Sequence, residues 1–89
     1  MKSDQSLLLR IARKDRQALE AVYDKYSPLV YRIVRNEIED RELAERIVCQ
    51  LFKDLWNRPQ TFRKKKLSIA MVKKCQLLIK TFPTLKVVN

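Results

Sequence analysis

The side chains of this chain that are best suited to chemistry are its lysines and arginines, and they are unevenly distributed. The segment from Leu55 to Asn89 contains nine Lys or Arg and no Asp or Glu, whereas the first 54 positions contain eleven basic residues and all ten acidic ones. Most of the formal net charge of +10 at pH 7 therefore comes from the back of the chain. Cations without neighbouring carboxylates attract phosphate, so this segment indicates a polyanionic partner.

Eight of these cations form what we call the basic arc: Arg58, Arg63, Lys64, Lys65, Lys66, Lys73, Lys74 and Lys80. Phosphate contacts of this kind give salt-dependent affinity and fix register, but they do not choose a sequence. Capture of a single strand usually adds stacking of bases on aromatic rings. The candidates are Phe62 and Trp56, although Trp56 fits packing against the core better. Two alternatives stay open: Lys64–Lys66 as a solvated loop, and residues 67–80 as a basic membrane-surface helix, which the weak polar/apolar split disfavours.

Other reactive groups are scarce. The chain has no His and no Gly, and its cysteines, Cys49 and Cys75, form no CxxC pair. Because a zinc site needs four N or S ligands, we expect no metal. The lack of a Gly-rich loop or a nucleophile motif predicts no enzyme activity and no cofactor. We expect two reduced core thiols in a cytoplasmic protein, with a redox switch between them as the alternative.

Composition predicts the fold class. A length of 89 residues and a hydrophobic content of 46% fit one folded domain. Because Gly supplies the positive φ angles of tight turns, its absence argues against a hairpin-rich β fold and favours helices. No run of 18 apolar residues exists and the N-terminal apolar stretch is too short for a secretory signal, so we expect no membrane span. We predict one all-α domain over residues 1–82 and a frayed tail over residues 83–89.

Apolar periodicity predicts a compact bundle of four helices. The predicted helices cover residues 3–14, 16–37, 41–56 and 67–80. Ser3 or Asp4, Asp15 and Asp40 are the expected N-caps. Pro28 predicts a kink or a restart in the second helix, which would make five helices. The third helix has the cleanest apolar face, made of Ala44, Ile47, Val48, Leu51, Phe52 and Leu55. The last is expected to turn Leu67, Ala70, Met71, Cys75 and Leu78 inward.

Two stretches carry a family resemblance over about residues 5–82. LLLRIARKDRQALEAVYDKYSPLVYRIV, followed by DRELAERIV and LFKDLW, resembles region 2 of sigma-70 family sigma factors, and most nearly the extracytoplasmic-function group. The matching residues in the first stretch are Leu19, Glu20, Val22, Tyr23, Tyr26, Pro28, Val30 and Tyr31. Those in the second are Asp40, Ala44, Glu45, Val48, Phe52, Leu55 and Trp56.

The resemblance implies a fold of the sigma region 2 type and a role in transcription initiation. In the family, the third helix packs on the coiled coil of the largest subunit of core RNA polymerase. The loop after it captures a flipped base of the promoter −10 element, and the fourth helix lies along the DNA. The implied polymerase-binding residues are Arg41, Glu42, Glu45, Arg46, Cys49, Gln50 and Lys53. The implied DNA-binding residues are the basic arc and Phe62.

The sequence also departs from the family pattern. Asp and Gln usually stand where this chain has Arg46 and Cys49, and the fourth helix lacks the usual Trp, Arg-Asn and later Asp. The family's −35-reading domain is not within these 89 residues, so an excised domain, a split factor and a diverged protein remain open. The partners implied are core polymerase, promoter DNA and an anti-sigma factor or a partner with the −35-reading domain. The alternative is a sigma-like protein-interaction module that has lost specific promoter reading.

Overall fold

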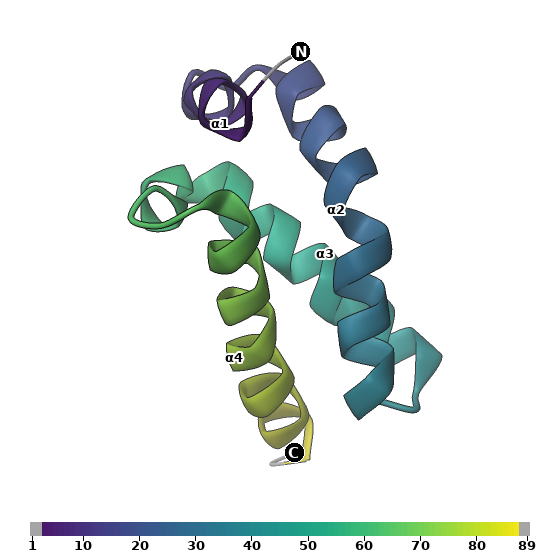
Figure 1. Ribbon diagram of the computed structural model, residues 1–89. Coiled ribbons are helices and arrows are strands. Elements are labelled where there is room, and N and C mark those ends of the chain that lie inside the picture. Colours follow the sequence, from purple (N-terminus) through teal and green to yellow (C-terminus); the bar gives the residue numbers. More distant parts are fainter. Residues whose placement is uncertain (1–2, 88–89) are drawn as a thin grey trace.

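The protein is all-helical over the residues that the computed structural model describes, namely residues 3–87, with side chains as far as Phe82. The elements are α1 (Asp4–Ala12), α2 (Arg16–Glu37), α3 (Arg41–Asn57), the 3₁₀ turn η1 (Pro59–Phe62) and α4 (Leu67–Val87). In Figure 1, α2 and α4 run on either side of α3, and α1 lies across one end. The prediction of a four-helix all-α domain is confirmed over this range.

The first three helices begin at side-chain caps. The Ser3 hydroxyl accepts a hydrogen bond from the Ser6 amide at 3.1 Å, which resolves the choice between Ser3 and Asp4. Asp15 accepts from the Gln17 amide, and Asp40 accepts from two amides of its own first turn. Each cap satisfies donors that the helix itself leaves unpaired, so the predicted starts of these helices are confirmed.

The corner between α1 and α2 is built entirely from local hydrogen bonds. The Lys14 amide donates to the Ile11 carbonyl at 2.8 Å and the Asp15 amide donates to the Arg10 carbonyl at 2.9 Å, which is the Schellman pattern. Lys14 has φ 65°, in the left-handed region that Gly usually occupies. The Arg10 guanidinium also pairs with the Asp15 carboxylate at 2.7 Å, and its hydrogen bond lowers the pKa of that carboxyl. Asp15 thus closes the end of α1 with its backbone amide and caps the start of α2 with its carboxylate.

Two prolines lie within helices. The predicted restart at Pro28 is wrong, because α2 continues through it. Pro28 has no N–H to offer the Asp24 carbonyl, but both residues are exposed, so water can reach that oxygen. The predicted end of the last helix near Lys80 is also wrong, because α4 continues past Pro83 to Val87. The frayed tail over residues 83–89 stays a prediction, and residues 88–89 lie outside the described range.

The core is purely apolar. No polar or charged residue in the described range is buried. The buried face of α3 consists of Leu43, Ala44, Ile47, Val48, Leu51, Phe52 and Leu55. From α4, Leu67, Met71 and Cys75 are buried, and Ala70 and Leu78 pack against them. The predicted apolar faces are therefore confirmed, with one correction for the thiols: Cys75 is a core residue, whereas Cys49 is exposed.

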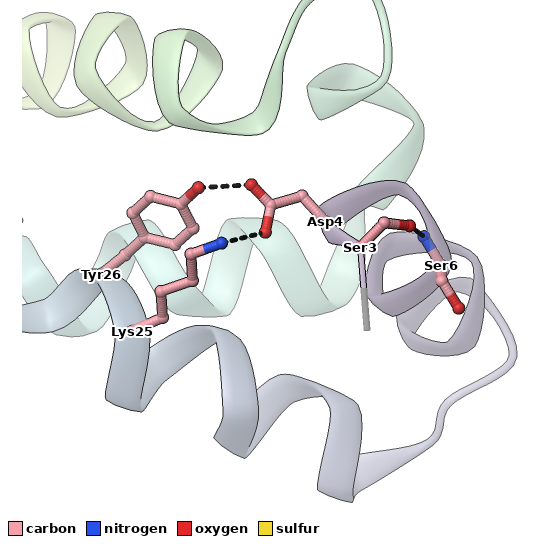
Figure 2. A network of polar contacts seen from close by, with 5 residues as sticks. All are labelled: Ser3, Asp4, Ser6, Lys25 and Tyr26. Carbon is pink, nitrogen blue, oxygen red and sulfur yellow. Dashed lines mark hydrogen bonds and ion pairs between the residues drawn. The ribbon is translucent and has the colours of Figure 1, made fainter. Parts of the chain in front are cut away.

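A carboxylate joins α1 to α2. Figure 2 shows the Asp4 carboxylate between Lys25, whose ammonium group lies 2.7 Å away, and the hydroxyl of Tyr26, which donates to its other oxygen. Partial burial of Asp4 opposes its ionisation, but the hydrogen bonds from Lys25 and Tyr26 outweigh that effect. The pKa of Asp4 therefore lies below its ordinary value of 3.8.

We expect Asp4→Asn to lower the free energy of unfolding at pH 6 by about 1 kcal/mol, since it removes a hydrogen-bonded charge pair. A carboxyl whose pKa is lowered by folding stabilises the fold above its unfolded pKa, and this contribution is lost as pH falls through the folded pKa. Urea unfolding of the wild type and the variant should therefore differ at pH 6 and converge below the ordinary value of 3.8.

Asp24→Asn is the matched control, because Asp24 lies on the exposed surface of α2. Asp24→Asn should show the same change in the free energy of unfolding between pH 6 and a pH below 3.8 as the wild type does. An Asp4→Asn variant as stable as wild type at pH 6 would show that the contacts of Figure 2 add nothing to stability.

Candidate nucleic-acid interface

The first half of the basic arc lies on a short loop that two buried residues anchor. Pro59 begins η1 and Phe62 ends it, and both are buried. The Thr61 hydroxyl donates to the Arg58 carbonyl at 2.8 Å, which tightens the turn. The four residues that follow, residues 63–66, are all cationic and all exposed. The burial of Pro59 and Phe62 therefore holds the exposed charges of residues 63–66 in place.

The second half of the arc lies on α4. Lys73 and Lys80 are exposed and Lys74 is half-buried. The Lys66 carbonyl accepts the first hydrogen bond of α4, from Ala70, at 3.0 Å, so Lys66 holds the position that Ser3 and the two aspartates hold in the other helices. A lysine side chain has no acceptor atom and cannot cap those amides. The start of α4 is therefore electropositive in both its side chains and its backbone.

Lys65 and Lys73 are brought together by the fold. Their ammonium groups lie close enough that the contact with Lys73 and its charge lower the pKa of Lys65 below the ordinary 10.5. Beside them, a cavity of about 150 Å³ is lined by Asp4, Gln5, Leu8, Lys65, Lys66, Leu67 and Ser68. Sequence spacing places Lys65 and Lys73 in the same basic segment, but only the path of the loop makes them neighbours.

Phe62 lies where a base cannot reach it. Its side chain is 0% exposed, and the Lys74 ammonium lies 5.4 Å from the centre of its ring. We correct the expectation that this ring stacks on a base. Trp56 is half-buried against the core, as expected. The Lys14 ammonium lies 4.7 Å from its ring centre and also bonds its carbonyl.

Arg58 of the arc has an acidic neighbour. Its guanidinium lies 3.9 Å from the Asp54 carboxylate, which also accepts a hydrogen bond from the Gln50 amide at 3.0 Å. The Arg58 side chain is well exposed, so this ion pair contributes little stability and leaves the guanidinium accessible.

The residues assigned to a polymerase share the outer side of α3. Six are exposed and Gln50 is half-buried; the exposed ones are Arg41, Glu42, Glu45, Arg46, Cys49 and Lys53. Arg46 pairs with Glu42 one turn earlier at 3.4 Å. The fold therefore keeps these side chains together on one helix and accessible.

Sequence reasoning missed two hollows between α2 and α3. The larger has a volume of about 520 Å³ and includes Pro28, Tyr31 and Val48 in its wall, and the other, about 420 Å³, includes Leu19, Phe52 and Trp56. Tyr23 and Cys49 line both. The Tyr23 ring is 47% exposed and packs on Phe52 with the ring centres 4.8 Å apart. The sequence could have indicated these hollows, because Tyr23 and Cys49 lie at the edges of the apolar faces of α2 and α3.

The two thiols differ in their surroundings, since Cys75 is buried and Cys49 is exposed. Burial raises the pKa of the Cys75 thiol to about 11, so it stays protonated at neutral pH. Both cysteines are free. Within the described residues, no group of three or more His, Cys, Asp or Glu side chains is placed to hold a metal ion. In the same range, no helix is long and apolar enough to cross a membrane.

Comparisons with protein-family models, with curated proteins and with solved structures find no match. The sigma-factor resemblance therefore stands on the residues quoted for it alone.

The Lys65–Lys73 contact predicts a chemical difference among neighbouring lysines. A lowered pKa means that a larger fraction of Lys65 is unprotonated at pH 9, and only the unprotonated amine acylates. We expect brief acetic anhydride treatment to modify Lys65 faster than Lys64 or Lys66, measured by mass spectrometry of peptides.

Lys73→Gln should abolish that difference, and Lys80→Gln, a change on the same helix, should leave it in place. Equal rates at Lys64, Lys65 and Lys66 in the wild type would show that the two ammonium groups are not neighbours in solution.

Proposed function

We propose that this chain acts as a sigma-factor domain of the region 2 type, which binds core RNA polymerase through α3 and promoter DNA through the basic arc. It is a DNA-binding transcription protein and not an enzyme, and it works in the cytoplasm. One observation carries the proposal. The outer side of α3, with charges of both signs, and the purely cationic basic arc are two different accessible surfaces, and the family resemblance implies polymerase as the partner of the first and DNA as the partner of the second.

The support for DNA binding is electrostatic. The arc is accessible at the loop and on α4, and the segment from Leu55 to Asn89 contains no Asp or Glu. A protein that neutralises several phosphates gains affinity from the release of condensed counterions. The anchored loop holds four of these cations in a fixed place, which limits the conformational entropy lost on binding.

The support for polymerase binding is the accessible outer side of α3 and its position beside the hollows lined by Tyr23 and Cys49. Aromatic side chains at the centre of an apolar depression, with a charged rim, are typical of protein interfaces. Arg46 is the residue least suited to the family's partner surface, because a carboxylate is usual there and reversed charges across an interface are costly.

The second candidate is a diverged or split sigma-like protein-interaction module that works with a partner protein and has lost specific promoter reading. Its partner would be an anti-sigma factor or a protein with the −35-reading domain. The observation that favours it is the burial of Phe62, the one aromatic residue inside the loop that the family uses to capture a base.

A pull-down on the immobilised coiled coil of the polymerase largest subunit tests the first proposal. We expect weak retention of the wild type at low salt and roughly tenfold stronger retention of Arg46→Asp, which restores the family's charge at that position. Arg35→Asp makes the same charge change at an exposed position of α2 and should give no gain. Failure of both the wild type and Arg46→Asp to bind would refute polymerase binding.

Band shifts on forked −10 probes separate the two candidates. The first predicts that a −10 consensus probe binds at least tenfold more tightly than a scrambled probe of equal length and charge. The second predicts equal, salt-sensitive binding of both probes, or none.

A further inference from the structure

The aromatic side chains of this protein are almost all taken up by its own fold. The chain has seven, all within the described range. Three are buried and three half-buried: Tyr26, Phe52 and Phe62, and Tyr31, Trp56 and Phe82. The exposed one, Tyr23, lies on α2 against Phe52, among the hollows that face α3. No exposed ring therefore accompanies the basic arc.

Two rings near the arc in sequence, Phe62 and Trp56, also carry intramolecular cations. Lys74 lies over Phe62 and Lys14 lies over Trp56, at 5.4 Å and 4.7 Å from the ring centres. A base that stacks needs the face of a ring. At Phe62 it would have to open the core, and at Trp56 it would have to displace the cation and the hydrogen bond from Lys14 to the Trp56 carbonyl.

The cations of the arc, in contrast, are arranged to receive negative charge. Residues 63–66, Lys65 among them, are four consecutive exposed cations, and Lys73 is an exposed cation on α4. Like charges at close range repel one another, and an anion between them converts that repulsion into attraction. The Asp4 carboxylate at the edge of the neighbouring cavity does not supply that charge, since it is already bonded to Lys25 and Tyr26.

We propose that the basic arc, Lys65 and Lys73 included, holds DNA by its phosphodiester backbone alone and that no unpaired base is captured. The inference rests on the DNA half of the proposed function, names its ligand as the backbone of duplex DNA, and predicts equal, salt-sensitive binding of the two forked −10 probes. A duplex has a higher density of charge along its axis than a single strand, so it is the preferred form. The domain then contributes attachment to the promoter and not its melting.

Fluorescence anisotropy with the full chain and three labelled probes of equal length tests the inference. The probes are a 20-base-pair duplex, its single strand, and a single strand in which abasic sites replace all bases. We expect the duplex to bind most tightly and the two single strands to bind within about twofold of each other. Trp56 emission should stay constant when either strand binds, because stacking on a base would quench it.

Substitutions connect the binding to the named lysines. Lys65→Gln with Lys73→Gln should weaken all three probes by about the same factor, on the order of tenfold, and reduce the slope of log affinity against log salt by up to about 2. Arg32→Gln with Arg35→Gln, which removes two exposed cations of α2, is the matched control and should change neither value. If the double variant retained wild-type affinity and slope, the assignment to Lys65 and Lys73 would be wrong.

The remaining outcomes distinguish failure of the inference from failure of the proposed function on which it rests. Tenfold tighter binding of the base-bearing strand than of the abasic strand, or quenching of Trp56, would overturn the inference and leave DNA binding in place. No binding of any probe at low salt would overturn both. Binding to vesicles that contain anionic phospholipid tests the membrane alternative. Vesicle binding that added DNA does not displace would overturn both the inference and the proposed DNA binding.

Discussion

Burial of the apolar face of α3 is the constraint on which the rest of this structure depends. Each of the other described elements, α1, α2, η1 and α4, contacts α3. Leu51 and Leu55 at the centre of that face are completely buried. Truncating such a side chain costs about 2–5 kcal/mol, a large part of the roughly 5–15 kcal/mol by which a domain is stable. Because the packed interior accepts no charged group, the lysines and arginines of the described chain all lie outside the core.

This constraint also explains the division of the surface. The loop after α3 is attached to the core by Pro59 and Phe62, so the exposed cations that follow are held in place by the core. The ring that fixes the loop is the same ring that a single-strand binder would need outside. In this chain, an anchored charged loop and an exposed stacking platform exclude each other at Phe62.

The periodic parts of the sequence could be predicted and the isolated parts could not. The apolar positions of α3 recur every three or four residues, and Asp15 and Asp40 precede such runs, so the helices and their starts followed directly. A single aromatic residue in a basic loop, such as Phe62, has no periodicity to show which way it faces. Pro28 was misjudged because its cost depends on whether water reaches the Asp24 carbonyl, which is a tertiary property. Cys49 lies at the edge of the apolar face of α3, where a small rotation of the helix decides whether a side chain is buried. The sigma-type role that we propose for these surfaces rests on the sequence resemblance alone.

The left-handed conformation of Lys14 has a consequence for how this chain can change. In a protein with no glycine, a lysine carries that backbone strain, at a cost of order 1 kcal/mol. The same side chain covers the ring and the carbonyl of Trp56, 42 positions later. A glycine at position 14 would relax the backbone but uncover the tryptophan, so the best residue at either position depends on the other. Positions 14 and 56 therefore form an epistatic pair, whose substitutions act non-additively.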